Sequence, residues 1–595
     1  MRGAHRWVIT AVLVLLATLP SQWAFGSFTS ADPPPRKIVS GWAPYWATSA
    51  STASIVANAD LMSEVTPFWF SVKSSTQIMD QYSSANSIPM ATQVSTLHSA
   101  GVQVIPTFTD GTKQLVLAGI LADPIKSATL IATLTSSAAL NNFDGIDLDW
   151  EGFAFSDGSS TWSTTQPNWT KFIGQLALAL HQGGKILSVT TPEIRDPATG
   201  KRGYWVYDWA GIANSIDRLR IMTYDYSVSS PGPIGPISWV EAAAKYAVSL
   251  VPASKVWIGI PAYGRDWVVG VSGTCPVFST DGKTLGLDIR APQAGVAGSR
   301  ATFVTKDAQT LAASYGATPT WSATYGENTF SYSKTYIGLN SAGGPASCTA
   351  QRTAWYQDSR GVQLRAALVG KYRLGGIAFW TFGSEDPATW DQLRSYARTI
   401  APDRVIGTLA LSQNPVGYAS PSVLTATFRI SDSRPVAGVP VVFQMLRSNE
   451  SNWKDIGTST TSLNGVAQIA LVGSQNIQVR AFSQGTWERL PASSDPQILG
   501  VSRVLSVQAA PSVRRSSPLQ LSGSVSPSDA GVGVVLQMKT ADRWNDIATS
   551  TTTDGGGFVL KVANPSAGLF AYRVVVKSDP RFDGVSSPPF TALIR

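Results

Sequence analysis

The chain has 595 residues, of which 44% are hydrophobic and 14% are charged. A single hydrophobic core stops growing at roughly 250 to 300 residues, so this length predicts at least two domains. The apolar content excludes a largely disordered chain. The formal net charge of +8 is spread over a large surface and does not indicate a nucleic-acid partner.

The N-terminus has the pattern of an export signal. Basic residues precede an apolar run from Trp7 to Leu19, and small residues follow it. This run is shorter than the roughly 20 residues that span a bilayer. We therefore predict a signal peptide over residues 1–26 and a spacer over 27–36, with an uncleaved anchor or another cleavage point as alternatives. The mature protein is expected to be secreted, monomeric and free of the membrane.

Short β-branched runs then alternate with helix-like stretches, which is typical of βα units and a parallel sheet. Eight such runs predict an α/β fold, a (β/α)8 TIM barrel over residues 37–402. The seventh and eighth runs are too far apart for a single connecting helix, which indicates a small α+β insertion over residues 265–354. Cys275 and Cys348 both fall in this insertion. Because an exported protein meets oxidising conditions, we expect them to form a disulfide.

Beyond the barrel, the pattern changes to short alternating strands separated by turn residues. VVFQM followed by WKDIGTSTTSLNG returns as VVLQM followed by WNDIATSTTTDGG, which places Trp453 and Trp544 91 residues apart. This period predicts two tandem immunoglobulin-like β-sandwich modules, over residues 403–500 and 501–595. One tryptophan per repeat is typical of a sandwich core, and a carbohydrate-binding surface is the alternative. Association with the cell wall through these modules is a further hypothesis.

The segment FDGIDLDWE ends at Glu151. In an extended strand alternate side chains share a face, so Asp147, Asp149 and Glu151 point the same way, at steps of about 6.6 Å. Barrel interiors normally hold Val, Ile or Leu, and acids at the C-terminal end of a barrel strand lie where barrel enzymes carry out chemistry. Three close carboxyls favour a shared proton and a raised pKa, which suits a general acid at the outermost position.

Acidic strand ends can also be helix caps or metal ligands. Only three histidines occur, and none lies beside a carboxylate or cysteine pattern that is typical of a metal site. The strict alternation of the acids also exceeds what a cap needs. We therefore predict a catalytic strand that needs no metal and no cofactor.

FDGIDLDWE resembles the DxxDxDxE signature of glycoside hydrolase family 18, the chitinases and their relatives. The sequence MTYD from Met222 to Asp225 resembles the MxYD of the sixth strand in that family. GIPAYGR, which contains Tyr263, resembles the seventh strand, and GGIAFW ends at Trp380, where the family has a tryptophan. The resemblance covers about residues 37–400 and does not extend into the tail.

The resemblance implies retaining hydrolysis in which the 2-acetamido oxygen of the substrate attacks the anomeric carbon. It implies that Glu151 protonates the leaving oxygen and that Asp149 orients the acetamido group. Asp147 would share a proton with Asp149. Tyr224 and Asp225 would hold the acetamido group and the distorted sugar.

The resemblance also places Trp380 beneath the reacting sugar, with Met222 packed nearby. Other aromatic residues near strand ends are candidates for sugar stacking, because a pyranose has apolar faces that aromatic rings cover well. Core packing is the alternative for each of them. These candidates are Tyr45, Trp46, Trp69, Tyr263 and Trp267.

We therefore expect a glycoside hydrolase whose partner is an N-acetylglucosamine-containing polysaccharide. The enzyme is expected to cleave its β-1,4 linkages, and chitin or chitooligosaccharides are the first candidate substrates. The first alternative is an N-acetylglucosaminidase of peptidoglycan or spore cortex. The second is a chitin-binding, lectin-like protein, which the presence of Glu151 disfavours. Two departures stand out: Gln357 replaces a common acid in WYQD, and the insertion is shorter and less aromatic than in long-chain chitinases. The latter disfavours a deep processive cleft.

Overall fold

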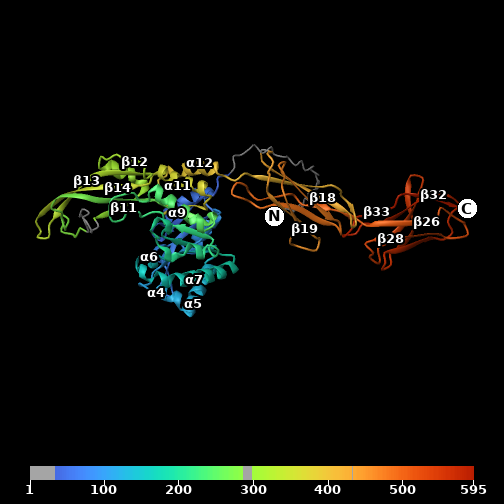
Figure 1. The fold of residues 1–595 in the computed structure, drawn as a ribbon, viewed down its shortest axis with the longest axis horizontal. Helices are drawn as coiled ribbons and strands as arrows, with labels where there is room; N and C mark the ends of the chain where they lie inside the picture. The colour runs from blue at the N-terminus through green and yellow to red at the C-terminus, as the bar shows by residue number, and fades with distance from the viewer. Residues whose placement is uncertain (1–33, 286–297, 432) are drawn as a thin grey trace, which may run out of the picture.

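The computed structural model describes residues 34–285, 298–431 and 433–595 (Figure 1). The predicted signal peptide and most of the predicted spacer lie outside the described residues. Among the described helices, none is by itself long and apolar enough to cross a membrane. Only α4 (Val116–Ala122) and α5 (Pro124–Leu140) reach that composition together, and they are bent by 104° at their junction.

Eight parallel strands close into a barrel. They pair in the order β1, β2, β5, β6, β7, β8, β9 and β15, and β15 pairs with β1 again, which confirms the predicted (β/α)8 barrel. The strands are β1 (Val39–Pro44), β2 (Glu64–Val72), β5 (Thr107–Asp110), β6 (Gly145–Asp149), β7 (Ile186–Thr191), β8 (Arg218–Ile221), β9 (Val256–Pro261) and β15 (Gly376–Trp380). Two short strands, β3 (Ile78–Asp80) and β4 (Gln103–Val104), add to β2.

Helices cover the outside of the barrel with apolar stripes. In α7 (Trp162–Gln182), Phe172, Ile173, Leu176 and Leu180 recur every three or four residues and are buried in the main core, as their period predicts. The other barrel helices are α1 (Thr48–Ala57), α2 (Gln81–Ala85), α3 (Met90–Ser99), α6 (Gly152–Phe155), α8 (Trp209–Ile212), α9 (Ile237–Leu250), α11 (Ser359–Tyr372) and α12 (Thr389–Thr399).

The barrel interior also holds a buried ionic network below the acids of β6. Glu64 on β2 accepts hydrogen bonds from Arg218 at 2.8 Å and from Arg220 at 2.7 Å, both on β8. Arg220 is fully buried, and it donates to Ser188 Oγ at 2.6 Å. Ser188 in turn donates to Asp147 at 2.6 Å. A chain of hydrogen bonds thus connects Glu64 and Arg220 to Asp147 on β6.

The insertion between β9 and β15 is a five-stranded antiparallel sheet with one helix, α10 (Ala308–Ser314). The sheet runs from Tyr263 to Tyr356, slightly beyond the predicted bounds of 265–354, because the seventh barrel strand continues almost directly into it. Its long strands project away from the barrel (Figure 1). The strands are β10 (Tyr263–Gly273), β11 (Arg300–Val304), β12 (Thr320–Ser322), β13 (Glu327–Leu339) and β14 (Pro345–Tyr356).

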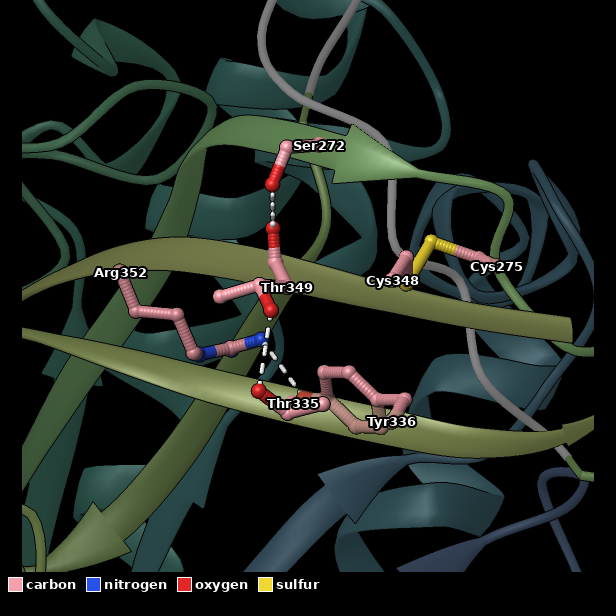
Figure 2. The surroundings of a disulfide bond; sticks show 7 residues. All are labelled: Ser272, Cys275, Thr335, Tyr336, Cys348, Thr349 and Arg352. Atoms are coloured by element: carbon pink, nitrogen blue, oxygen red, sulfur yellow. Dashed lines mark hydrogen bonds between the residues drawn. A yellow bond between two sulfur atoms is a disulfide. The ribbon is translucent and has the colours of Figure 1, made fainter.

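Cys275 and Cys348 form a disulfide with their Cα atoms 4.6 Å apart. It joins the segment after β10 to β14, where Gly273 lies opposite Cys348 (Figure 2). Beside it, the hydroxyls of Thr335 and Thr349 lie 2.9 Å apart across β13 and β14. The disulfide therefore closes the outer end of the insertion sheet.

The tail forms two all-β units, each made of two sheets packed around its own core. The first has β16 (Val405–Leu411), β18 (Pro421–Ile430) and β21 (Val466–Val472) opposite β19 (Pro440–Leu446), β20 (Lys454–Thr460), β22 (Ile477–Ser483), β23 (Ala492–Ser493) and β24 (Gln497–Leu499). The second has β26 (Val504–Ala509), β28 (Leu519–Ser526) and β31 (Gly557–Val562) opposite β27 (Ser512–Val513), β29 (Gly533–Thr540), β30 (Arg543–Thr551), β32 (Gly568–Val576), β33 (Val585–Ser586) and β34 (Phe590–Ile594). Short strands β17 (Val416–Gly417) and β25 (Val501–Ser502) pair near the junction of the two units.

Each unit docks onto the preceding domain through an equivalent hairpin loop. The loop between β22 and β23 carries Trp487, which packs against the barrel core and lies 3.8 Å from the guanidinium of Arg36. The loop between β32 and β33 carries Phe582, which is buried in the core of the first unit. The barrel and the two units follow one another along the long axis of the molecule (Figure 1).

The prediction that Trp453 and Trp544 form the sandwich cores is wrong. Neither ring belongs to a core cluster, and both are partly exposed. Phe443 and Leu536 are buried in the two cores instead. The tryptophan of each repeat therefore lies on the outer face of its sheet. Alternation along the adjacent strand does not predict this position.

Candidate active site

Three acids follow β6 from the barrel interior to its C-terminal end. Asp147 is fully buried and accepts hydrogen bonds from three hydroxyls: Thr107 at 2.9 Å, Ser188 at 2.6 Å and Thr190 at 3.0 Å. These donors come from β5 and β7, the two strands that flank β6. They fix the carboxylate below Asp149, and the proton shared between Asp147 and Asp149 stays a prediction.

Asp149 is buried one step further out, and its Oδ1 has no hydrogen-bond partner among the described residues. Burial, followed by the charges of Glu151 and Asp147, raises the pKa of Asp149 well above its usual range. A buried polar atom without a partner is costly, and a bound substrate can satisfy it. Asp149 is therefore available to a ligand in the cleft.

Glu151 lies at the mouth of the barrel, immediately before α6. Its side chain reaches solvent within the cleft, yet protein surrounds it on most sides, and this loss of solvent together with the charge of Asp225 raises the pKa of Glu151. Beneath it, the buried Tyr207 donates a hydrogen bond to the carbonyl oxygen of Trp150 at 2.7 Å. A carboxyl with a raised pKa beside a cleft can remain protonated and donate its proton.

The segment after β8 supplies Tyr224 and Asp225. Gly259 on β9 makes room for Tyr224, since a Cβ atom there would lie 2.7 Å from the Tyr224 ring. Burial, followed by the charge of Asp149, raises the pKa of Tyr224 well above its usual value, so its hydroxyl stays protonated. Asp225 has a left-handed backbone with φ of 61°, an arrangement that is common at functional sites. Tyr263 donates to its carboxylate, and Arg265 pairs with it at 2.6 Å.

These side chains line a cleft of about 460 Å³. Trp380 lies in its wall with edge-to-face contacts to Phe68 at 5.0 Å and to Trp42 at 5.7 Å. Trp46 also lines the cleft and is 57% exposed. The lining is Trp46, Asp149, Glu151, Met222, Tyr224, Asp225, Ala262, Tyr263, Arg265, Thr302, Val304, Trp380, Thr381 and Ser384.

Four of the predicted site residues do not line this cleft. Trp69 and Trp267 are buried in hydrophobic clusters instead. Asp147 lies below it, as described above. Tyr45 packs edge-to-face on Trp46 at 4.8 Å and against the barrel core, which supports the exposed Trp46 ring. The structure thus brings the other predicted catalytic and sugar-contacting residues into one cavity.

Sequence reasoning missed several cleft residues. Arg265 shares the face of Tyr263 two residues earlier, so the period of two along this strand could have found it. Thr302 and Val304 come from the insertion, whose register no pattern in the chain specifies. Thr302 lies directly opposite Arg265 in the pairing of β11 with β10.

Gln357, where the sequence departs from the family pattern, is buried outside the cleft lining. Its amide donates to Glu327 Oε1 at 3.0 Å. Glu327 also pairs with Arg365 and accepts the backbone N–H groups of Ile234 and Gly235. An acid at position 357 would face this buried carboxylate, so the amide suits the surrounding structure.

The two histidines in the described chain lie on helices α3 and α7, and each pairs with a carboxylate. His98 lies 2.8 Å from Asp144, and His181 lies 2.8 Å from Asp217. Asp144 and Asp217 also accept backbone N–H groups at the starts of neighbouring strands. These pairs join helix ends to strands, and no group of three or more potential metal ligands occurs among the described residues.

The charge of Asp225 should contribute to the alkaline limit of activity, in addition to the larger effect of burial on the pKa of Glu151. The negative charge of Asp225 raises the pKa of Glu151, and a general acid loses activity as the pH rises through its pKa. Asp225→Asn removes that charge, lowers the pKa of Glu151 and should move the alkaline limb of the kcat/KM profile to lower pH.

Tyr263→Phe is the matched control, because it removes one hydrogen bond to Asp225 without changing the charge. It should lower the rate and leave the limb in place. A limb that stays in place in Asp225→Asn would show that this charge does not set the titration.

A barrel with a carboxyl of raised pKa, a second buried acid and aromatic rings that line a cleft at its C-terminal face is typical of a glycoside hydrolase. Comparison with known proteins agrees. The model of the glycosyl hydrolases family 18 matches residues 40–385. The chain belongs to this family, and the predicted resemblance is confirmed.

Three relatives illustrate the family. A putative sporulation-specific glycosylase, YdhD, of Bacillus subtilis is 24% identical over 55% of this chain and 70% of its own length. Chitinase 63 of Streptomyces plicatus is 31% identical over 24% of this chain and 25% of its own. The crystal structure of a chitinase from Chromobacterium violaceum is 25% identical, with a TM-score of 0.47, over 60% of this chain and 98% of that structure.

Proposed function

We propose that this enzyme is exported and cleaves β-1,4 linkages of N-acetylglucosamine polymers, chitin or chitooligosaccharides, by substrate-assisted catalysis. The unpartnered, buried Oδ1 of Asp149 next to Glu151 carries the proposal. It offers a polar contact that an acetamido group would satisfy. The apolar run and basic residues at the N-terminus support export.

The available carboxylates support attack by the substrate itself. Besides Asp149 and Glu151, the lining contains Asp225, and Arg265 and Tyr263 already bind that carboxylate. Retaining hydrolysis then needs another nucleophile, and in this family the 2-acetamido oxygen takes that role. An N-acetyl group on the reacting sugar is therefore essential to the mechanism.

In the first step, Glu151 gives its proton to the glycosidic oxygen, and the bond from that oxygen to the anomeric carbon breaks. The acetamido oxygen bonds to the anomeric carbon and forms an oxazolinium ion, whose positive charge Asp149 stabilises. The Tyr224 hydroxyl holds the acetamido group. The ionised Glu151 then takes a proton from water, which attacks the anomeric carbon and restores the acetamido group with net retention.

A wall or spore-cortex N-acetylglucosaminidase is the second candidate. The likeness to a relative named as a sporulation-specific glycosylase favours it, and the same catalytic groups would serve both polymers. Peptidoglycan also carries N-acetylated sugars in β-1,4 linkage.

Digestion of colloidal chitin and of peptidoglycan stripped of other polymers, in parallel, separates the two candidates. We expect chitooligosaccharides to be released from chitin, with masses that rise in steps of one N-acetylglucosamine unit. Release from peptidoglycan alone would select the second candidate. Release from neither polymer would contradict both.

A further inference from the structure

Each tail unit carries the same four side chains on the outer face of one sheet. In the first unit, the guanidinium of Arg480 lies 4.3 Å from the ring centre of Trp453 and donates through Nε to Gln444 at 2.8 Å. Gln444 donates to Asp455 at 2.8 Å. We call this row of Trp, Arg, Gln and Asp the outer ladder.

The second unit repeats the outer ladder. Arg573 lies 4.6 Å from the ring centre of Trp544 and donates to Gln537 at 2.7 Å, and Gln537 donates to Asp546 at 2.7 Å. Both tryptophans and both arginines are partly exposed, and both aspartates are exposed. Four residue types, their order and their hydrogen bonds are therefore the same in two units.

A β-bulge sets up each ladder. The register of β19 against β20 shifts between Phe443 and Gln444, and that of β29 against β30 shifts between Leu536 and Gln537. A bulge changes which face the following side chains occupy. Here it brings Asp455 and its counterpart Asp546 opposite the two glutamines, on the outer face.

On the other sheet, one polar pair of the first unit is not repeated in the second. In the first unit, Gln468 donates to Thr425 across β21 and β18 at 2.9 Å. The equivalent pair in the second unit is Val559 opposite Ser522. The two units thus differ on the outer face of this sheet, whereas the ladder on the opposite sheet is the same in both. A general need for polar side chains at the surface does not explain this difference.

We propose that the two outer ladders are binding sites for a neutral polymer of N-acetylated hexoses. Each ladder contains one positive side chain, the arginine, and one negative side chain, the aspartate. It therefore has no net charge that would favour an anionic polymer. The exposed part of the indole offers the apolar contact that a pyranose face needs, and the amide, carboxylate and guanidinium offer fixed hydrogen-bonding groups beside it. The identity of the polymer rests on the proposed function.

Two ladders on one chain bind a polymer together. The second unit is docked on the first through Phe582, so the spacing of the two ladders is set by a packed contact. When one ladder is bound, the second meets the same polymer at a high effective concentration. The tail would therefore hold the catalytic domain on an insoluble substrate.

Binding is tested with full-length Glu151→Gln enzyme, so that the polymer is not degraded during the measurement. Sedimentation with colloidal chitin and, in a second arm, with stripped peptidoglycan gives the apparent Kd for each polymer. We expect Trp453→Ala and Trp544→Ala each to weaken binding about 10-fold, and the double variant about 100-fold. A larger effect on chitin supports the assignment of a neutral polymer. A larger effect on peptidoglycan, whose stem peptides carry charges, would contradict that assignment.

Leu463→Ala is the control, because this residue is 87% exposed in the turn between β20 and β21 and lies outside the ladder. It should bind like its parent. Should the double tryptophan variant fail to fold, Arg480→Lys with Arg573→Lys keeps the charge but loses the planar guanidinium, and it should also weaken binding.

Unchanged binding of the folded variants to both polymers would overturn the proposal. Hydrolysis of a soluble chitobioside by the unmodified enzyme is measured separately. Its absence would contradict the proposed function and leave the binding result to be judged on its own.

Discussion

Glu151→Gln should lower the turnover of a chromogenic chitobioside by about 10² to 10⁴-fold, the contribution of a well-placed general acid. Glutamine has nearly the same shape and can still hydrogen-bond, but it has no proton to give to the leaving oxygen. Because Asp149, Tyr224 and Trp380 stay in place, sugar binding should be retained. Steady-state kinetics and equilibrium binding of chitooligosaccharides measure the two effects separately.

Glu241→Gln is the matched control. This residue lies on α9 outside the cleft and pairs with Lys371 at the surface, where an ion pair contributes little. Its activity should equal that of the unmodified enzyme. Undiminished turnover in Glu151→Gln would assign the proton donor to another residue.

Glu64→Gln should lower the free energy of unfolding by about 3 to 5 kcal/mol, the usual cost of breaking a buried ion pair. Glu64 and Arg220 are both fully buried and lie 2.7 Å apart inside the barrel. The neutral amide would leave the guanidinium of Arg220 in the interior without a direct counter-charge. Chemical denaturation followed by circular dichroism measures the loss.

Arg218→Met is the control for this pair. Arg218 also binds Glu64 but is partly exposed, and its removal leaves Arg220 in contact with the carboxylate. We expect a clearly smaller loss than for Glu64→Gln. Equal stability of Glu64→Gln and the unmodified protein would show that other groups neutralise Arg220.

Much of the barrel and of the candidate site could be predicted from local patterns. Alternation along one strand was enough to place Asp147 and Asp149 on one face, because the side-chain period of a strand is two. Glu151 lies two residues beyond the end of β6 and has helical backbone angles, so the strand period does not account for its position. The apolar stripe of α7 followed in the same way from the helical period. Such patterns depend only on neighbours in the sequence.

Contacts between distant segments could not be predicted. Glu64 meets Arg220, 156 residues later, because β2 and β8 face each other across the barrel. The position of Thr302 in the wall of the cleft depends on the register of the insertion sheet. For Trp453 and Trp544, the β-bulges determine which face of the sheet the side chains occupy. A bulge adds one residue to a strand, and alternation along the sequence does not reveal it.

Substrate-assisted cleavage requires an N-acetyl group on the reacting sugar. The measurement compares kcat/KM for a chromogenic chitobioside with that for the same glycoside in which the reacting sugar carries a free amine. We expect efficient cleavage of the first and almost none of the second, because the amine has no carbonyl oxygen to attack the anomeric carbon. Equal cleavage of the two glycosides would contradict substrate-assisted catalysis in this enzyme.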